Sequence, residues 1–339
     1  MNKKVRNLLQ YMLFLGFGFF LLWLTLRKSS WGEIKSNLAG TNFIYLIPAT
    51  ISLLFAHFFR AVRWKIMIEP LGYKPSTQNT FLAVLIGYWA NLAFPRLGEV
   101  LKCTILARYE KVPADKLVGT ILAERAFDFV TLLVVLGITI IVQYDIVGMY
   151  TLDEFKKIFQ SRTGHISYTR VIGAVIFITA LIFAINFLVK KYAHLSFIKK
   201  TKLVLIGVWS GLTSVRNIKN KGWFFFHSVL IWLFYLISTY MGFFAMPGMR
   251  EYGVRVALSV LTFGAIGMIV PSPGGIGSYQ YAVQQVLLVY GVSEARGLSL
   301  GILIWFCQTA ILLITGTLSF IMLPFLNKKD NRTEDQPVS

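Results

Sequence analysis

Long apolar runs separated by short polar stretches dominate the sequence. A membrane-spanning helix needs about 17–25 mostly apolar residues. Two shorter apolar runs, 80–94 and 254–270, end abruptly in segments that contain proline and glycine. The pattern therefore predicts an all-α integral membrane protein with two further elements of unusual form. The six runs that are long enough for full spans are 8–26, 43–59, 118–142, 171–189, 223–246 and 298–323.

The composition narrows the class of protein further. Hydrophobic residues make up 56% of the 339 residues and charged residues only 14%, whereas soluble domains are about 25% charged. This excludes a soluble enzyme, a disordered chain and a conventional nucleic-acid-binding protein. The two cysteines, Cys103 and Cys307, lie in or beside apolar runs, so no disulfide framework or metal cluster is predicted and no cofactor is expected.

The basic residues that produce the net charge of +19 give the orientation. Cytoplasmic loops of membrane proteins carry an excess of Lys and Arg. Segments 60–79 and 98–117 are rich in basic residues, and 190–222 has eight basic residues and no acid, whereas 143–170 is nearly neutral. We expect a multi-pass protein of the inner (cytoplasmic) membrane with both termini, including the polar tail 327–339, in the cytoplasm.

This orientation determines the form of the two short runs. Since 60–79 and 98–117 both lie in the cytoplasm, the run 80–94 must enter the membrane and return on the same side. The run 254–270 must do the same from the outside. The sequence therefore predicts two re-entrant helical hairpins that face each other.

An internal repeat supports the same plan. When the chain is shifted along itself so that Gly87 falls on Gly267, Asp128 falls on Gln308 and the order of the segments superimposes. We divide the domain 1–326 into halves 8–142 and 171–323, each with three spans and one hairpin. Because three crossings invert the second half, the result is the inverted repeat of many transporters. The alternative is a chance alignment of apolar runs.

The residues at the two breaks could bind an anion. Proline removes an amide donor and biases the preceding residue away from the helical region, and glycine relaxes the turn. The helix that resumes after each break would present free amides to a phosphate, and Arg96 would add a charged donor. The alternative is an ordinary loop at the membrane surface. The residues concerned are Pro95, Arg96 and Gly98 at the first break and Pro271, Pro273, Gly274, Gly275 and Gly277 at the second.

Charged side chains also interrupt the predicted span 118–142. Glu124, Arg125 and Asp128 lie near its centre, where charges are costly and normally face a cavity or a partner. We expect an Arg125–Asp128 pair within the helix, with Glu124 turned toward Arg96 or another cation. Glu99 adds a carboxylate at the first break, while the second half supplies the neutral Gln280. These groups could form a polar path for a lipid head group or a proton, or a purely structural clamp.

The segment 59–68 combines aromatic and basic residues, among them Arg60, Arg63 and Lys65. This pattern predicts an amphipathic helix on the cytoplasmic leaflet, near anionic head groups. The sequence contains no P-loop, no Gly-x-Ser-x-Gly motif and no histidine pair with metal-ligand spacing. No enzymatic activity and no metal site are expected.

In combination, these motifs resemble the flippase-like transmembrane family, which includes the membrane domain of bacterial lysylphosphatidylglycerol synthases. The resemblance covers roughly residues 10–325 and implies re-entrant helices and movement of lipids between leaflets. We expect no soluble aminoacyl-transferase domain after the membrane part and therefore no lipid aminoacylation. Gln280 stands where relatives are expected to carry an acid. The motifs are Arg60-x-x-Arg63-Trp64, Pro95-Arg96-x-Gly98-Glu99, Glu124-Arg125-x-x-Asp128 and Pro271-x-Pro273-Gly274-Gly275-x-Gly277.

Three functions remain open at this point. The first is binding and translocation of an anionic lipid, either a phospholipid or a polyprenyl-phosphate derivative. The second is a non-transporting membrane subunit that presents lipid to a separate synthase or glycosyltransferase. The third is a membrane-embedded transferase. The partners expected are anionic lipids and such an enzyme, not nucleic acid, and the chain could form oligomers.

Overall fold

The computed structural model describes residues 3–27, 29–94, 96–148, 172, 173, 176, 218–270 and 272–327. All regular secondary structure in these ranges is helical. The prediction of a span over 171–189 and those for Pro95, Pro271 and the tail after Asn327 lie outside the described residues.

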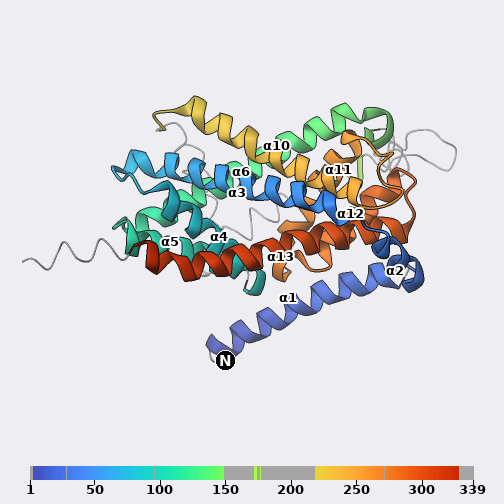
Figure 1. Ribbon diagram of the computed structural model, residues 1–339, viewed down its shortest axis with the longest axis horizontal. Coiled ribbons are helices and arrows are strands. Elements are labelled where there is room, and N and C mark those ends of the chain that lie inside the picture. Colours follow the sequence, from blue (N-terminus) through green and yellow to red (C-terminus); the bar gives the residue numbers. More distant parts are fainter. Residues whose placement is uncertain are drawn as a thin grey trace, which may run out of the picture.

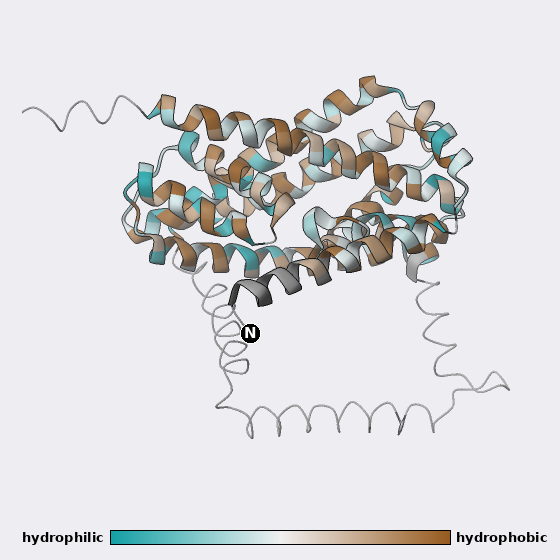
Figure 2. Ribbon diagram, turned by 90° about the horizontal axis from the view of Figure 1, so that it is seen from below, coloured by the Kyte–Doolittle hydropathy of each residue, from teal (hydrophilic) through white to brown (hydrophobic). Residues whose placement is uncertain are grey.

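Four of the six predicted spans fall on helices of spanning length, while the described part of the predicted span 8–26 holds the shorter apolar helix Leu15–Leu26. Four stretches are long and apolar enough to cross a membrane, namely Phe43–Leu71, Ala114–Val142, Lys221–Ala245 and Glu294–Leu326. Hydrophilic residues gather toward the two ends of the bundle, as Figure 2 shows. In chain order the helices are α1 Lys3–Leu26, α2 Trp31–Ala39, α3 Leu46–Ile68, α4 Thr77–Ala93, α5 Leu97–Tyr109, α6 Ala114–Val142, α10 Lys221–Ala245, α11 Val254–Ile269, α12 Ser278–Val289 and α13 Glu294–Leu326, with short turns η1 Phe43–Tyr45, η2 Glu69–Leu71, η3 Tyr144–Gly148 and η5 Pro273–Gly275.

Both predicted breaks are present. Phe94 ends α4 in an extended conformation (φ −131°, ψ 114°), as expected for a residue before proline. Val270 ends α11 with φ −59° and ψ 131°, also outside the helical region. The chain reverses after each break, so that α4 packs on α5 and α11 packs on α12. The two short apolar runs are therefore the first arms of helical hairpins.

The hairpins close tightly because small residues meet at their helix interfaces. A Cβ atom on Gly98 would overlap the carbonyl oxygen of Gly87 on the facing helix. In the second hairpin a Cβ atom on Gly267 would lie 2.7 Å from the carbonyl oxygen of Ser278. The internal repeat superimposes Gly87 on Gly267, and the same shift places Gly98 on Ser278. The two hairpins thus pack through corresponding positions.

The long helix α13 lies alongside both hairpins (Figure 1). Near its start, Gly301 packs on the backbone of Gln280 in α12. At its end, the side-chain amides of Asn327 and Asn79 of α4 exchange hydrogen bonds of 2.9 and 3.0 Å. The second hairpin therefore lies along the first part of α13 and the first hairpin along the last part, so the hairpins approach from opposite ends of the bundle.

The tips of the hairpins meet near the middle of α13. The indole Nε1 of Trp305 donates a hydrogen bond of 2.7 Å to the carbonyl oxygen of Gly274 in η5. A Cβ atom on Gly274 would lie 3.3 Å from the side chain of Leu92, close to the end of α4. The two breaks thus lie beside each other.

The same contacts recur in reverse in the other half. Helix α6 packs on α5 and on α11, just as α13 packs on α12 and on α4. Its end reaches the base of the second hairpin, where the side chain of Gln143 donates to Ser259 at 2.7 Å and accepts from Tyr290. Helices α3 and α10 pack against each other between the hairpins. This reciprocal arrangement is the one that an inverted repeat predicts.

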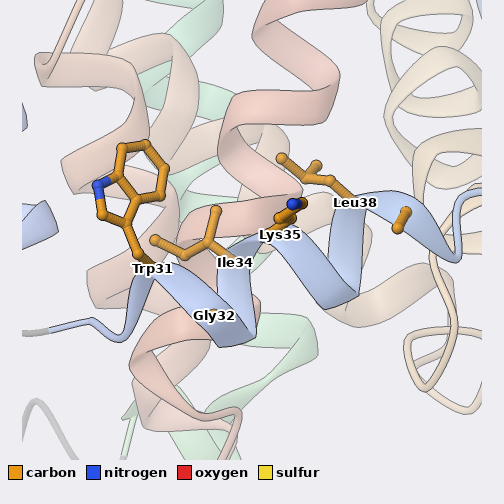
Figure 3. A pocket seen from close by; sticks show the side chains of 6 residues that line it. Trp31, Gly32, Ile34, Lys35 and Leu38 are labelled. Atoms are coloured by element: carbon orange, nitrogen blue, oxygen red, sulfur yellow. The ribbon is translucent and has the colours of Figure 1, made fainter.

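Helices α1 and α2 lie against the second hairpin and α13. Gly277 has a φ of 78°, and a Cβ atom on it would overlap the carbonyl oxygen of Gly18 in α1. In α2, Ile34 is buried against Ala295 and Leu298 of α13. An open apolar hollow beside α2 has Lys35 as its one charged lining residue among those that the structure describes (Figure 3).

Candidate functional site

A cluster of five charged side chains lies buried between α3, α5 and α6. We call it the charge cluster. Arg63 and Glu124 expose only 1% and 2% of their surface, and Lys102 and Arg60 are also buried. Asp128 is partly buried. The members are Arg60 and Arg63 from α3, Lys102 from α5, and Glu124 and Asp128 from α6.

Ion pairs connect every member of the charge cluster. Asp128 accepts hydrogen bonds from Arg60 at 2.6 Å and from Arg63 at 2.5 Å. Glu124 accepts from Arg60 and from Lys102, each at 3.1 Å. Residues three or four apart share one face of a helix, so Arg60 and Arg63 face Glu124 and Asp128 directly. The cluster therefore fixes α3 and α5 against the middle of α6.

Trp64, which directly follows Arg63 in α3, supports this arrangement. Its indole Nε1 donates to the hydroxyl of Thr120 on α6 at 2.9 Å. Its ring lies 4.3 Å from the Nζ of Lys102, a cation–π contact that strengthens when water is excluded. The Arg-x-x-Arg-Trp motif thus sets two arginines of α3 against the carboxylates of α6 and places the tryptophan ring beside a third cation, Lys102.

The charge cluster carries an excess of positive charge, because three cations face two carboxylates. Burying charges that are not fully compensated is expensive and usually serves a function. The corresponding positions of the second half hold no charge at all, so the site belongs to one half of the repeat. These positions are Tyr240, Phe243, Ala282, Ile304 and Gln308.

Unsatisfied polar atoms gather at the same place. Most buried polar atoms in proteins have a hydrogen-bond partner in the protein or in ordered water, so exceptions mark places where a water, an ion or a ligand can bind. Of seven buried side-chain atoms without a partner in the described residues, five lie in or next to the charge cluster: Nε of Arg60 and Arg63, both ring nitrogens of His57, and Oε2 of Glu99. The site therefore retains hydrogen-bonding capacity for a further group.

The location predicted for Arg60 and Arg63 is wrong. Helix α3 continues through Ile68 without a break, and both guanidinium groups are buried against α6 instead of lying on a leaflet surface. The prediction ended the span at 59 because a hydropathy count treats arginine as a boundary and cannot see carboxylates on a helix far along the sequence. Lys65 is partly buried and donates to Thr77 at 3.1 Å.

The predicted Arg125–Asp128 pair is also wrong. Arg125 donates to Glu99 of α5 at 2.7 Å, in a pair that remains partly exposed. Asp128 is already held by two arginines of α3, which approach it more directly than a side chain of its own helix can. Lys102 was missed by the sequence reasoning. Its position three residues after Glu99, on the same face of α5, is the signal that could have identified it.

At the first break the side chain of Arg96 is exposed, whereas the backbone amide of Gly98 is already hydrogen-bonded within the protein. Arg96 has a φ of 71°, and its side chain is exposed. The backbone amide of Gly98 donates to the side-chain oxygen of Asn91 at 2.8 Å. This amide is therefore occupied, and Arg96 is the group at this break that is available to an anion.

The second break is similarly closed by protein groups. The amide of Gly277 donates to Oε1 of Gln280 at 2.8 Å, and Gln280 itself is buried. Pro273 and Gly275 are buried, and Gly274 and Gly275 adopt positive φ values of 57° and 74°. Gln280 thus caps its own helix. No group of three or more potential metal ligands occurs in the described ranges.

Two known proteins are similar to this chain over most of its length. The UPF0104 membrane protein MJ1595 of Methanocaldococcus jannaschii is 25% identical over 261 residues, which cover 73% of this chain and 75% of that protein. Glycosyltransferase AglD of Haloferax volcanii is 20% identical over 319 residues, which cover 86% of this chain but only 51% of AglD. No solved structure matches significantly.

A family comparison covers most of the chain. The family described as the lysylphosphatidylglycerol synthase TM region matches residues 10–316, which include both hairpins and all members of the charge cluster. The protein therefore belongs to the lysylphosphatidylglycerol synthase TM-region family.

Proposed function

We propose that this protein binds the head group of an anionic lipid at the charge cluster and moves the lipid between the two leaflets. The observation that carries the proposal is the surplus positive charge at the cluster, together with buried donors that have no partner in the part of the chain that the structure describes. Guanidinium groups suit a phosphate because they donate charge-assisted hydrogen bonds. A phospholipid and a polyprenyl-phosphate lipid both supply such a phosphate.

The position of the cluster along α6 supports translocation as well as binding. Asp128 lies at the middle of Ala114–Val142, so it would lie near the centre of a bilayer that this helix crosses. A head group crossing the membrane pays its largest desolvation cost at this depth. A fixed positive site there lowers that cost for an anion.

We further propose that the full fold has six spans and that both hairpins are re-entrant. Each hairpin leaves and returns at the same end of the bundle, and the two tips meet between the ends. Broken helices inside a bilayer are tolerated where protein groups satisfy their amides, as Asn91 and Gln280 do here. The proximity of Asn327 to Asn79 places the C-terminal end of α13 beside the base of the first hairpin, in agreement with a cytoplasmic location for both.

A transport assay tests this function. Proteoliposomes containing fluorescent phosphatidylglycerol are treated with a membrane-impermeant quencher, which reports movement between leaflets. Arg96→Ala should slow this movement about tenfold if the phosphate passes the first break on its way to the charge cluster, since it then loses a charge-assisted hydrogen bond there. The variant should unfold at the wild-type temperature, because Arg96 makes no ion pair with the described residues.

The matched control removes a cation far from the breaks in sequence. Lys35→Ala, on the exposed face of α2, should leave transport unchanged. Equal rates of lipid movement for Arg96→Ala and Lys35→Ala would show that Arg96 does not contact the lipid during transport. Failure of the wild-type protein to bind any anionic lipid would contradict the whole proposal.

The match to AglD favours a second candidate function. A relative named as a glycosyltransferase matches this chain over only about half its own length. The membrane part could therefore present a lipid to a separate glycosyltransferase without transporting it. That function predicts lipid binding in pure liposomes without movement between leaflets, and stable co-purification with such an enzyme.

A further inference from the structure

His57 is a buried histidine with no hydrogen-bond partner among the described residues. It lies on α3, exposes 3% of its surface, and neither ring nitrogen contacts a donor or acceptor in the described part of the chain. An imidazole buried in this way loses two hydrogen bonds that water would provide. Both ring nitrogens are therefore available to a ligand that reaches this position.

Two tyrosines from other helices surround His57. The ring centroid of Tyr88 on α4 lies 4.5 Å from the imidazole, and that of Tyr235 on α10 lies 6.1 Å away, edge-on. Both tyrosines are partly buried, and their hydroxyls make no hydrogen bond to the described residues. We call these three residues the His57 subsite. They bring together, from three helices, hydrogen-bonding groups that have no partner among the described residues, and only the His57 nitrogens among them are fully buried.

The His57 subsite adjoins the charge cluster. Arg60 follows His57 by three residues on the same face of α3, and its guanidinium carbon lies 5.8 Å from the centroid of the Tyr88 ring. A ligand whose phosphate contacts Arg60 would therefore place its next atoms beside the imidazole and the two phenols.

The chemistry of the subsite selects the kind of group that fits. A neutral imidazole offers one donor and one acceptor, and each phenol offers a donor and an acceptor. The subsite contains no carboxylate to pair with an ammonium group. Mixed neutral donors and acceptors match hydroxyl groups, which also donate and accept.

We infer that the His57 subsite binds the hydroxyl groups of a lipid head group whose phosphate lies at Arg60. This inference rests on the proposed function and narrows it to phosphodiester lipids with a hydroxylated head group, either glycerol or a sugar. A lipid that ends in an alkyl group after the phosphate would leave the three side chains unsatisfied.

Native mass spectrometry of the detergent-solubilised protein tests the inference. Phosphatidylglycerol and phosphatidylmethanol with identical acyl chains carry the same charge and differ in the head-group hydroxyls. The wild-type protein should bind phosphatidylglycerol about tenfold more tightly, as expected for a few neutral hydrogen bonds. The double variant Tyr88→Phe/Tyr235→Phe should bring the two affinities to within about twofold by weakening only phosphatidylglycerol binding.

The control is Tyr281→Phe, which removes a partly buried hydroxyl on α12 and should keep the preference. The same binding measurement with a polyprenyl phosphoglucose distinguishes a sugar head group from glycerol. The lipid whose binding falls more in the double variant represents the class whose hydroxyls the subsite binds. Equal binding of phosphatidylglycerol and phosphatidylmethanol by the wild-type protein would overturn the inference and leave the proposed function intact. Absence of binding for all three lipids would contradict the proposed function itself.

Discussion

Glu124→Gln should destabilise the protein more than any other single charge substitution in the described residues. Glu124 is 2% exposed and accepts from Arg60 and Lys102, with Arg63 at 3.6 Å. The glutamine leaves three buried cations against one carboxylate. Removing one partner of a buried ion pair costs about 3–5 kcal/mol, and equilibrium unfolding in mixed micelles should show a loss of this size.

Two further variants separate charge from packing. Adding Lys102→Met to Glu124→Gln removes the cation that is left unpaired, so it should recover most of the lost free energy of unfolding. Glu99→Gln disrupts the partly exposed pair with Arg125, which should cost at most about 1 kcal/mol. Equal destabilisation by Glu124→Gln and Glu99→Gln would show that the charge cluster is not the buried network described above.

Gly98→Ala should separate α4 from α5. The added methyl group would overlap the carbonyl oxygen of Gly87, and the side chain of Asn91 lies on the same side. Backbone atoms cannot move aside as a flexible side chain can, so the helices must shift and displace Lys102, which packs on Gly87. We expect a loss of about 3 kcal/mol or more in unfolding free energy, at the upper end for an overpacked site, together with loss of lipid transport.

Gly119→Ala provides the matched control for this substitution. Gly119 lies in α6, and a Cβ atom there would meet nothing within 4 Å. The alanine should therefore fold as the wild type does, with a small gain from its higher helix propensity. If both alanine variants unfold alike, the hairpin is not closed by the contact between Gly87 and Gly98.

Much of the fold could be predicted from the sequence because a helix that crosses the hydrocarbon of a membrane must be long and mostly apolar. The apolar runs 223–246 and 298–323 correspond to α10 and α13, and Phe94 and Val270, which both lie outside the helical region, precede prolines as expected. The internal repeat paired Gly87 with Gly267, and these two glycines make corresponding contacts in the structure.

The ion pairs could not be predicted in the same way. The partners of Arg60 and Arg63 lie on α6, which is separated from α3 in sequence by the whole first hairpin, and no local pattern links residues so far apart. Counting charges by segment therefore assigned both arginines to a membrane surface. The two polar caps, Asn91 on Gly98 and Gln280 on Gly277, depend on side-chain rotamers that a sequence does not reveal.

The depth of the two hairpin tips in the membrane tests whether the hairpins are re-entrant. Spin labels at Leu97 and Ile269, exposed residues beside the two breaks, can be measured by electron paramagnetic resonance in proteoliposomes after Cys103 and Cys307 are replaced by alanine. If both hairpins are re-entrant, both labels lie near the bilayer centre, about 15 Å from either boundary of the hydrocarbon, with high accessibility to oxygen and low accessibility to a water-soluble nickel complex. Labels that lie at opposite membrane surfaces and are quenched by the nickel complex would contradict the re-entrant form.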